Sequence, residues 1–187
     1  IKDLILSSQF ATKEDLKLSI KTNSDNEKIT DLFAGNAKPL VKKYDFIKGF
    51  EGGYLKFDSI EKNKVSNSNL KIFDFKLKEV PALTKLLTLA SLQGIADLLT
   101  GEGIRFNEFE MIFNNKAGLM TIEEIYSLGP SISILMDGYI QKDDLVSLRG
   151  TLVPATTVNK VIGSIPLIGD ILVGKKAGEG VFGVSFK

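Results

Sequence analysis

Apolar and polar residues alternate along most of this chain, in runs that are typical of β-strands with one face in water. The clearest run is Asp15 to Thr22, where Leu16, Leu18 and Ile20 point one way and lysine and serine side chains point the other. Similar alternation predicts further strands at residues 4–10, 54–60, 70–80, 104–113, 119–128, 131–140, 145–153 and 182–186. These roughly nine strands do not follow a repeated strand–helix–strand order, so we expect an antiparallel sheet.

Three other segments carry helical signals. Ser24, Asp25 and Asn26 can begin a short helix whose apolar stripe includes Ile29 and Leu32, together with Phe33 before a stop at Gly35. Pro81 can open a second helical segment that ends by Gly103, with apolar residues at helical spacing. Residues 156–173 form the third segment, which Pro166 divides into two short pieces.

The strand predicted at 104–113 contains a slip in its alternation. Ile104 and Phe106 are followed by Phe109, Met111 and Phe113 across an odd step. A bulge near Asn107 and Glu108 would explain the slip and would also bend the sheet. We therefore expect a curved sheet.

The segment at 156–173 is almost wholly apolar in its second half, which is too short to span a bilayer, since a span takes about 20 residues. Either it covers the protein's own core, or it docks on a partner or a membrane surface. The residues that would make this contact are Ile162, Ile165, Leu167, Ile168, Ile171 and Leu172.

These elements predict one mainly β domain with short helices, of the α+β class, over residues 1–187. Strands and one short helix occupy 1–80, a helical segment occupies 81–103, and an antiparallel meander with a helical cap at 156–173 occupies 104–187. The chain begins at Ile1 and ends within a strand pattern at Lys187. We therefore expect it to be a fragment of a longer protein.

The amino-acid composition argues against several classes of function. The chain has no Cys and no His, which removes Ser-His-Asp and Cys-His catalysis, the usual zinc sites and the commonest neutral-pH general base. We expect no enzyme activity, cofactor or metal. The net charge is only +1, and Arg105 and Arg149 are the sole arginines among 24 basic residues. Nucleic-acid readers concentrate positive charge and use arginine forks, so nucleic acid is not an expected partner.

Three runs together resemble the C-terminal region of the bacterial AsmA-like family, of the AsmA, TamB and YhdP type. They are DFKLKEVPALTKLLTLASLQGIADLLTGEGIRFNEFEMIF, GLMTIEEIYSLGPSISILMDGYI and LRGTLVPATTVNKVIGSIPLIGDILVGKKAGEGVFGVSF. The likeness begins at about Asp74 and is fainter before it. The resemblance implies a groove-shaped, taco-like β structure, capped here by the C-terminal helices. It also implies a periplasmic part of a protein anchored in the inner membrane, with the anchor outside this fragment, and phospholipid transport towards the outer membrane.

A lipid groove needs a continuous apolar wall, which one-sided strands can supply. The candidate wall residues are Leu16, Leu18, Ile20, Phe57, Phe73, Phe75, Ile132, Ile134, Phe182, Val184 and Phe186. Phe73, Phe75 and Leu77 are expected on one face of their strand. The same alternation also fits a sheet whose apolar face is filled by the protein's own core. The alternative function is a periplasmic docking or scaffold domain that binds an outer-membrane assembly partner or the membrane surface through the apolar cap.

Overall fold

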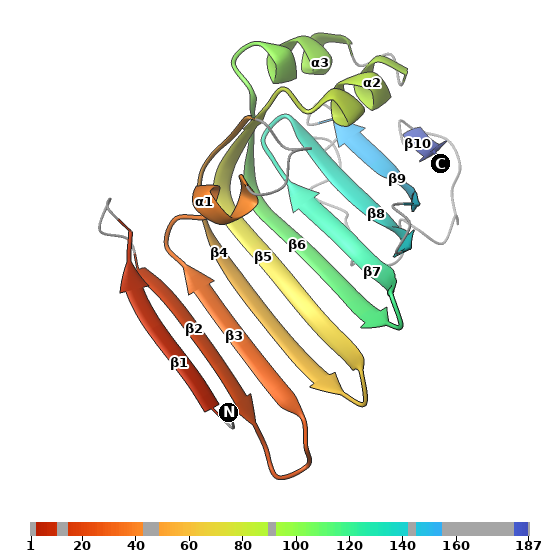
Figure 1. Ribbon diagram of the computed structural model, residues 1–187. Helices are drawn as coiled ribbons and strands as arrows, with labels where there is room; N and C mark the ends of the chain where they lie inside the picture. The colour runs from red at the N-terminus through yellow and green to blue at the C-terminus, as the bar shows by residue number, and fades with distance from the viewer. Residues whose placement is uncertain are drawn as a thin grey trace, which may run out of the picture.

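A single antiparallel sheet dominates the computed structural model, which describes residues 3–10, 15–42, 49–89, 93–141, 145–154 and 182–186. Ten strands lie in chain order from one edge to the other, and the sheet is open and curled (Figure 1). The mainly β, antiparallel and curved architecture expected from the sequence is confirmed. The strands are β1 Asp3–Gln9, β2 Asp15–Thr22, β3 Lys28–Ala34, β4 Gly49–Lys62, β5 Val65–Lys78, β6 Ile104–Lys116, β7 Leu119–Leu128, β8 Ile132–Gln141, β9 Val146–Pro154 and β10 Phe182–Phe186.

The described helices all lie at one end of the sheet (Figure 1). Helix α1 (Lys38–Val41) joins β3 to β4, and α2 (Pro81–Leu89) and α3 (Gln93–Thr100) join β5 to β6. Leu87 of α2 and Leu99 of α3 are fully buried in the hydrophobic core. Helices α2 and α3 thus lie within the helical segment predicted at 81–103, and the core is centred near this end. The predicted cap at 156–173 lies outside the described residues.

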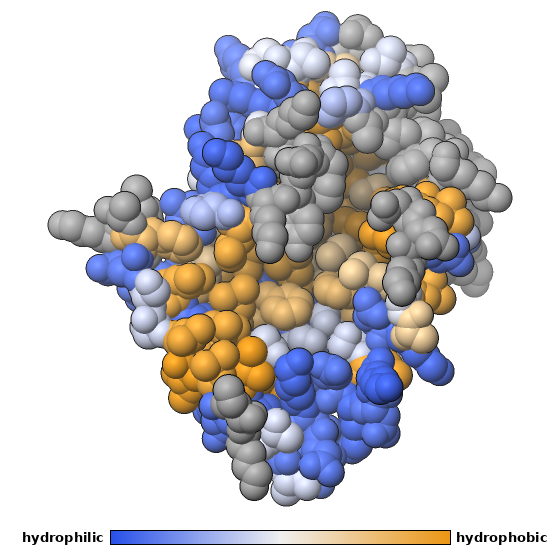
Figure 2. All heavy atoms as spheres, viewed as in Figure 1, coloured by the Kyte–Doolittle hydropathy of each residue, from blue (hydrophilic) through white to orange (hydrophobic). Residues whose placement is uncertain are grey.

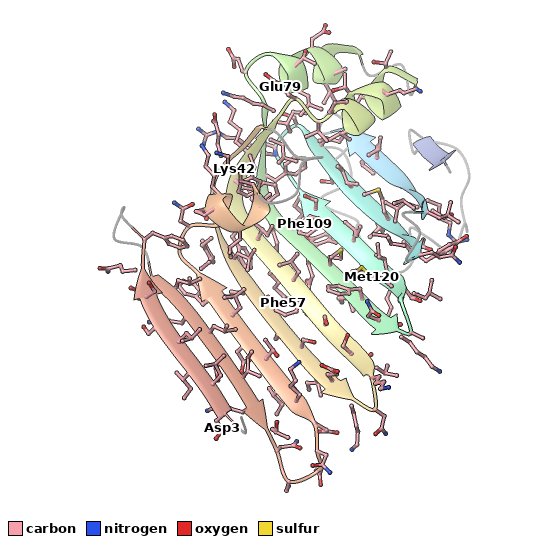
Figure 3. The ribbon with its side chains drawn as sticks, in the orientation of Figure 1. Asp3, Lys42, Phe57, Glu79, Phe109 and Met120 are labelled. Atoms are coloured by element: carbon pink, nitrogen blue, oxygen red, sulfur yellow. The ribbon has the colours of Figure 1, made fainter. Side chains whose placement is uncertain are left out.

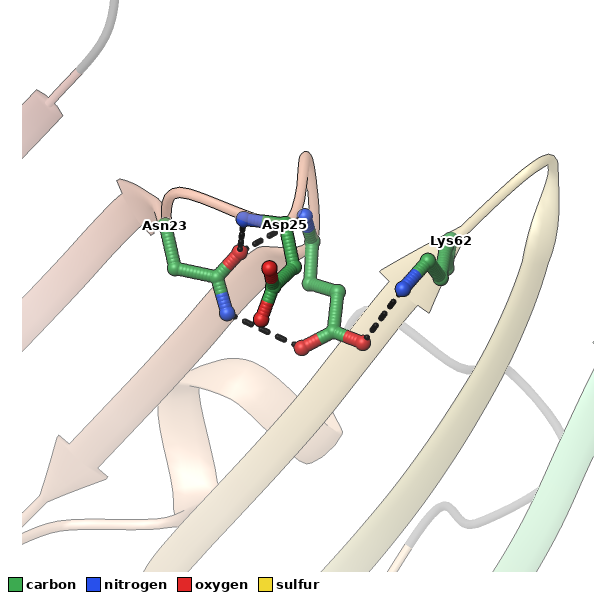
Figure 4. A network of polar contacts seen from close by, with 4 residues as sticks. Asn23, Asp25 and Lys62 are labelled. Atoms are coloured by element: carbon green, nitrogen blue, oxygen red, sulfur yellow. Dashed lines mark hydrogen bonds and ion pairs between the residues drawn. The ribbon is translucent and has the colours of Figure 1, made fainter.

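The helix predicted from Ser24 to Gly35 is wrong, because residues 28–34 form strand β3. Asn23 closes the β2–β3 hairpin with its side chain, whose Oδ1 accepts hydrogen bonds from the backbone N–H groups of Asp25 and Glu27, both at 2.9 Å (Figure 4). Such a side-chain turn replaces the helix cap that the same residue types suggest. With β3, the described residues contain ten strands, one more than the sequence predicts.

The two faces of the sheet differ in polarity. Leu18 pairs with Leu32, and Leu32 pairs with Phe57; we call the face that carries these side chains the inner face. Alternation places Lys17 and Lys56 on the opposite, outer face.

Side chains switch faces in the second half of β5, which has 14 residues. Phe73 stacks on Tyr54 of the outer face with ring centroids 4.9 Å apart, whereas Phe75 lies in the core. The backbone makes the switch at Asp74, which has a φ of 53°, beside Gly53 of β4, which has a φ of 77°. The shared face predicted for Phe73 and Phe75 is therefore wrong, because left-handed residues break the simple alternation.

The slip in β6 has the same origin. The β5–β6 pairing keeps one register on both sides of Asn107, with Phe73 opposite Glu108 and Phe75 opposite Phe106. The two strands switch faces together, so no extra residue is inserted at Asn107 and the bulge expected there is replaced by a matched crease.

An extra residue is present instead in β7. The pairing of β7 with β8 changes register between Ile122 and Ile125. The pairing of β7 with β6 changes register in the same part of β7. This bulge keeps both isoleucines on one face, where they are 3% and 7% exposed.

Candidate functional site

An unbroken apolar row crosses the inner face of the sheet. Each member is the direct cross-strand partner of the next, from β1 to β8: Leu6, Leu18, Leu32, Phe57, Leu70, Met111, Ile125 and Met136. Adjacent strands are about 4.8 Å apart, so seven spacings give this apolar row a length of about 34 Å. Direct cross-strand contact between apolar side chains also stabilises the sheet itself.

Much of the apolar row is open to solvent. Leu6 is 53% exposed, and the members from Leu18 to Met111 are half-buried, whereas Ile125 is 7% exposed. Figure 2 shows apolar residues gathered across the middle of this side of the molecule, with polar residues at the lower end. The row is therefore most accessible on β1 to β6 and becomes closed at β7.

The inner face is filled at its helical end. Phe75 stacks between Phe50 and Phe106, with ring centroids 5.3 and 5.4 Å apart, and all three are at most 5% exposed. Leu87 and Leu99 of the helices belong to the same core cluster. A self-filled core and an open apolar surface thus divide one face of the sheet between them.

The candidate wall residues fall into four groups. Leu16, Leu18, Ile20 and Phe57 are half-buried on the inner face. Phe75, Ile132 and Ile134 are buried in the core cluster, and Phe73 lies on the outer face. Phe182, Val184 and Phe186 are in β10, paired with β9, but their side chains are outside the described part, as are cap residues 162–172.

Several members of the row were not among the sequence-based candidates. The register identifies these members as Leu6, Leu32, Leu70, Met111 and Met136. Leu70 and Met111 stand in alternating runs that could have shown them, whereas Leu32 was hidden within the wrong helix. Phe57 and Phe109, labelled in Figure 3, also lie on this face, where Phe109 pairs with Ile72.

Polar residues interrupt the inner face near the hairpin end of β3 to β5. Lys28 Nζ lies 3.0 Å from Glu61 Oε2, and the Ser68 hydroxyl donates to the Ser59 hydroxyl at 2.8 Å. Thr30 is the cross-strand partner of Ser59. These five residues form what we call the polar corner, and its Thr30 and Ser59 stand two residues from Leu32 and Phe57 of the apolar row.

The outer face carries a different set of contacts. Lys56 Nζ lies 6.0 and 5.9 Å from the ring centroids of Tyr54 and Phe73, within the range of a cation–π interaction. Beside it, Lys71 Nζ and Asn69 Nδ2 contact Glu110 Oε1 at 3.0 and 2.7 Å. These contacts connect neighbouring strands on the outer face of the sheet.

Two outer-face carboxyl groups have shifted pKa values. Burial and the neighbouring Asp31 raise the pKa of Asp58, although Lys71 opposes this. Burial would also raise the pKa of Glu110, but hydrogen bonds from Lys71 and Asn69 and the charge of Lys71 lower it overall. The two shifts have structural causes in the strand pairing, since Asp31 and Asp58 are direct cross-strand partners.

A surface hollow of about 460 Å³ is lined by residues of strands β1 to β4. Eight of its twelve lining residues come from the two outer-face rows that flank the apolar row: Ile5, Ser7, Lys17, Ser19, Asp31, Phe33, Lys56 and Asp58. The next inner-face positions, such as Leu16 and Ile20, do not line it. The other four lining residues, Leu6, Leu18, Leu32 and Phe57, are the members of the apolar row on β1 to β4, so the hollow follows the row along these strands.

The described residues contain no group of three or more His, Cys, Asp or Glu side chains that could hold a metal ion. None of the described helices has the length and hydrophobicity of a membrane-spanning helix. Comparison with known proteins found no match among family models, curated proteins or solved structures.

Proposed function

We propose that this chain binds phospholipid acyl chains along the apolar row and takes part in non-enzymatic phospholipid transport between the inner and outer membranes of a bacterium. The observation that carries the proposal is the partly exposed apolar row, which runs without a polar member from Leu6 to Met136. The resemblance to AsmA-like proteins supplies the biological setting, a periplasmic region of an inner-membrane-anchored protein.

The dimensions and energetics suit this task. The hydrocarbon core of a bilayer is about 30 Å thick, so one acyl layer is about 15 Å, and the apolar row of about 34 Å exceeds it. Exposing about 15 methylene groups to water costs on the order of 12 kcal/mol. A continuous apolar surface removes most of this cost without any reactive group, which agrees with a site built from Leu, Phe, Met and Ile side chains.

The open inner face also accounts for the exposed leucines. A chain that only needed a core would gain by covering Leu4 and Leu6 of the inner face, which are 37% and 53% exposed, because each fully buried side chain contributes about 1.5–3 kcal/mol. The helices instead fill only the end of the face around Phe75. The remainder can receive hydrocarbon from a membrane.

The test is native mass spectrometry, with lipid extraction, on protein purified from bacterial cells without detergent. We expect bound phospholipid in the wild-type chain, a loss of most of it in Phe57→Asp, and retention in the matched control Phe33→Asp. Phe33 is also half-buried but lies on the outer face, where its ring is 6.4 Å from that of Tyr54. Circular dichroism establishes that both variants are folded.

Lipid-free wild-type protein, or equal lipid loss in two folded variants, would contradict the proposal. A lipid-free result would favour the docking or scaffold function, in which residues 162–172 bind a partner protein or a membrane surface.

A further inference from the structure

We infer that the polar corner holds the headgroup of the bound lipid and selects a zwitterionic headgroup, with phosphate and ammonium, over an anionic one. This inference rests on the proposed lipid binding and adds the class of lipid. Its basis is the pairing of Lys28 with Glu61 on the inner face, next to three hydroxyl side chains and the apolar row.

The polar corner is confined to strands β3 to β5 of the inner face, which is otherwise mainly apolar. Ser59 and Ser68 are cross-strand partners, and the same row continues into Phe113 and Ile122. Apolar side chains therefore fit at this level of the sheet, yet β3 to β5 carry hydroxyls there. Ser68 is only 7% exposed, and a buried hydroxyl costs free energy unless it has a hydrogen-bond partner.

The donors and acceptors of the corner match a zwitterion. Within the described residues, the Thr30 hydroxyl has no side-chain hydrogen bond. The Ser59 oxygen accepts a hydrogen bond from the Ser68 hydroxyl, which leaves the Ser59 O–H group able to donate. These hydroxyls and the Lys28 ammonium can donate to phosphate oxygens, while the Glu61 carboxylate can accept from an ammonium. A zwitterionic headgroup can place its phosphate on Lys28 and its ammonium on Glu61, whereas the phosphate of an anionic headgroup would occupy Lys28 and leave the Glu61 carboxylate without a cation.

The distance from the corner to the apolar row suits a single amphiphile. Thr30 and Ser59 are each two residues from members of the row, Leu32 and Phe57, which is about 7 Å along a strand. A headgroup on the corner would therefore place its acyl chains at the start of the open part of the inner face.

The experiment exposes the wild-type chain to vesicles of equal amounts of phosphatidylethanolamine and phosphatidylglycerol, and then quantifies both lipids on the re-isolated protein. We expect phosphatidylethanolamine to be enriched about threefold over the vesicles, equivalent to about 0.7 kcal/mol, because an exposed ion pair contributes on this scale. Glu61→Lys should reduce the ratio to one or below, and the double exchange Lys28→Glu with Glu61→Lys should restore it. Total bound lipid should stay the same.

The matched control is Glu27→Lys, which makes the same charge change in the adjacent turn, where Glu27 pairs with Lys62 outside the polar corner (Figure 4). Its lipid ratio should equal that of the wild type. Bound lipid with the composition of the vesicles, or a ratio that Glu61→Lys leaves unchanged, would overturn the headgroup inference alone. Absence of any bound lipid would overturn the proposed function together with it.

Discussion

Replacing Phe75 and Phe73 separately by alanine tests the face switch at Asp74. The two rings are two residues apart on β5, so regular alternation would place them on one face. The structure places Phe75 in the core between two other phenylalanines and Phe73 on the outer face against Tyr54. The two substitutions remove the same atoms from very different surroundings.

The expected losses of stability follow from these surroundings. Phe75 is 5% exposed, and replacing a buried phenylalanine by alanine costs about 3–5 kcal/mol. Phe73 is half-buried and loses one stacked pair, which contributes about 0.5–1.5 kcal/mol, with part of its apolar contact. We therefore expect Phe73→Ala to cost about 1–2 kcal/mol in total.

Urea unfolding followed by circular dichroism measures both free energies. With a slope of about 2 kcal/mol per molar urea, Phe75→Ala should lower the midpoint by about 1.5–2.5 M and Phe73→Ala by less than about 1 M. Equal shifts, or a larger shift for Phe73→Ala, would mean that the two rings share a face and would refute the crease in β4 to β6.

Two further predictions concern backbone and charge. Gly53→Ala should destabilise the fold by about 1–2 kcal/mol, because the residue has a φ of 77° and the added Cβ would lie 2.9 Å from a β5 side chain. Gly94→Ala should instead stabilise the fold by about 0.5–1 kcal/mol in the same urea assay, because Gly94 lies in a helix with open space around it. The lowered pKa of Glu110 means that its contacts with Lys71 and Asn69 stabilise the fold above its ordinary pKa of 4.5 and that this contribution is lost as the pH falls below that value. Urea midpoints between pH 7 and pH 3 should therefore fall less steeply for Glu110→Gln than for the wild type, and parallel profiles would contradict the assignment.

The sequence predicts the strands well where one face is consistently apolar, as at Leu16, Leu18 and Ile20. It fails at β3, because Leu32 and Phe33 are adjacent apolar residues that serve opposite faces and so imitate a helical stripe. It also fails at Phe73, because the alternation is perfect and only the left-handed backbone of Asp74 breaks it. Such a conformation is uncommon for a residue other than glycine.

The boundary between the filled and the open part of the inner face could not be predicted from alternation. Phe57 and Phe75 have similar sequence surroundings, but only Phe75 lies at the end of the sheet that α2 and α3 cover. Which residues a helix buries depends on where the connection returns to the sheet. The register, which links distant parts of the chain, is needed to recognise the apolar row.

The meander order of the strands has a consequence for folding. In the described part of the chain, each strand pairs only with the strands before and after it, so the contact order is low for a β protein and growth can proceed by successive hairpins. The 14-residue strands β4 and β5 form the longest hairpin, a suitable nucleus. Strand β1, exposed at all seven residues, should exchange its amide hydrogens first, and opening should then spread strand by strand, as in a linear repeat protein.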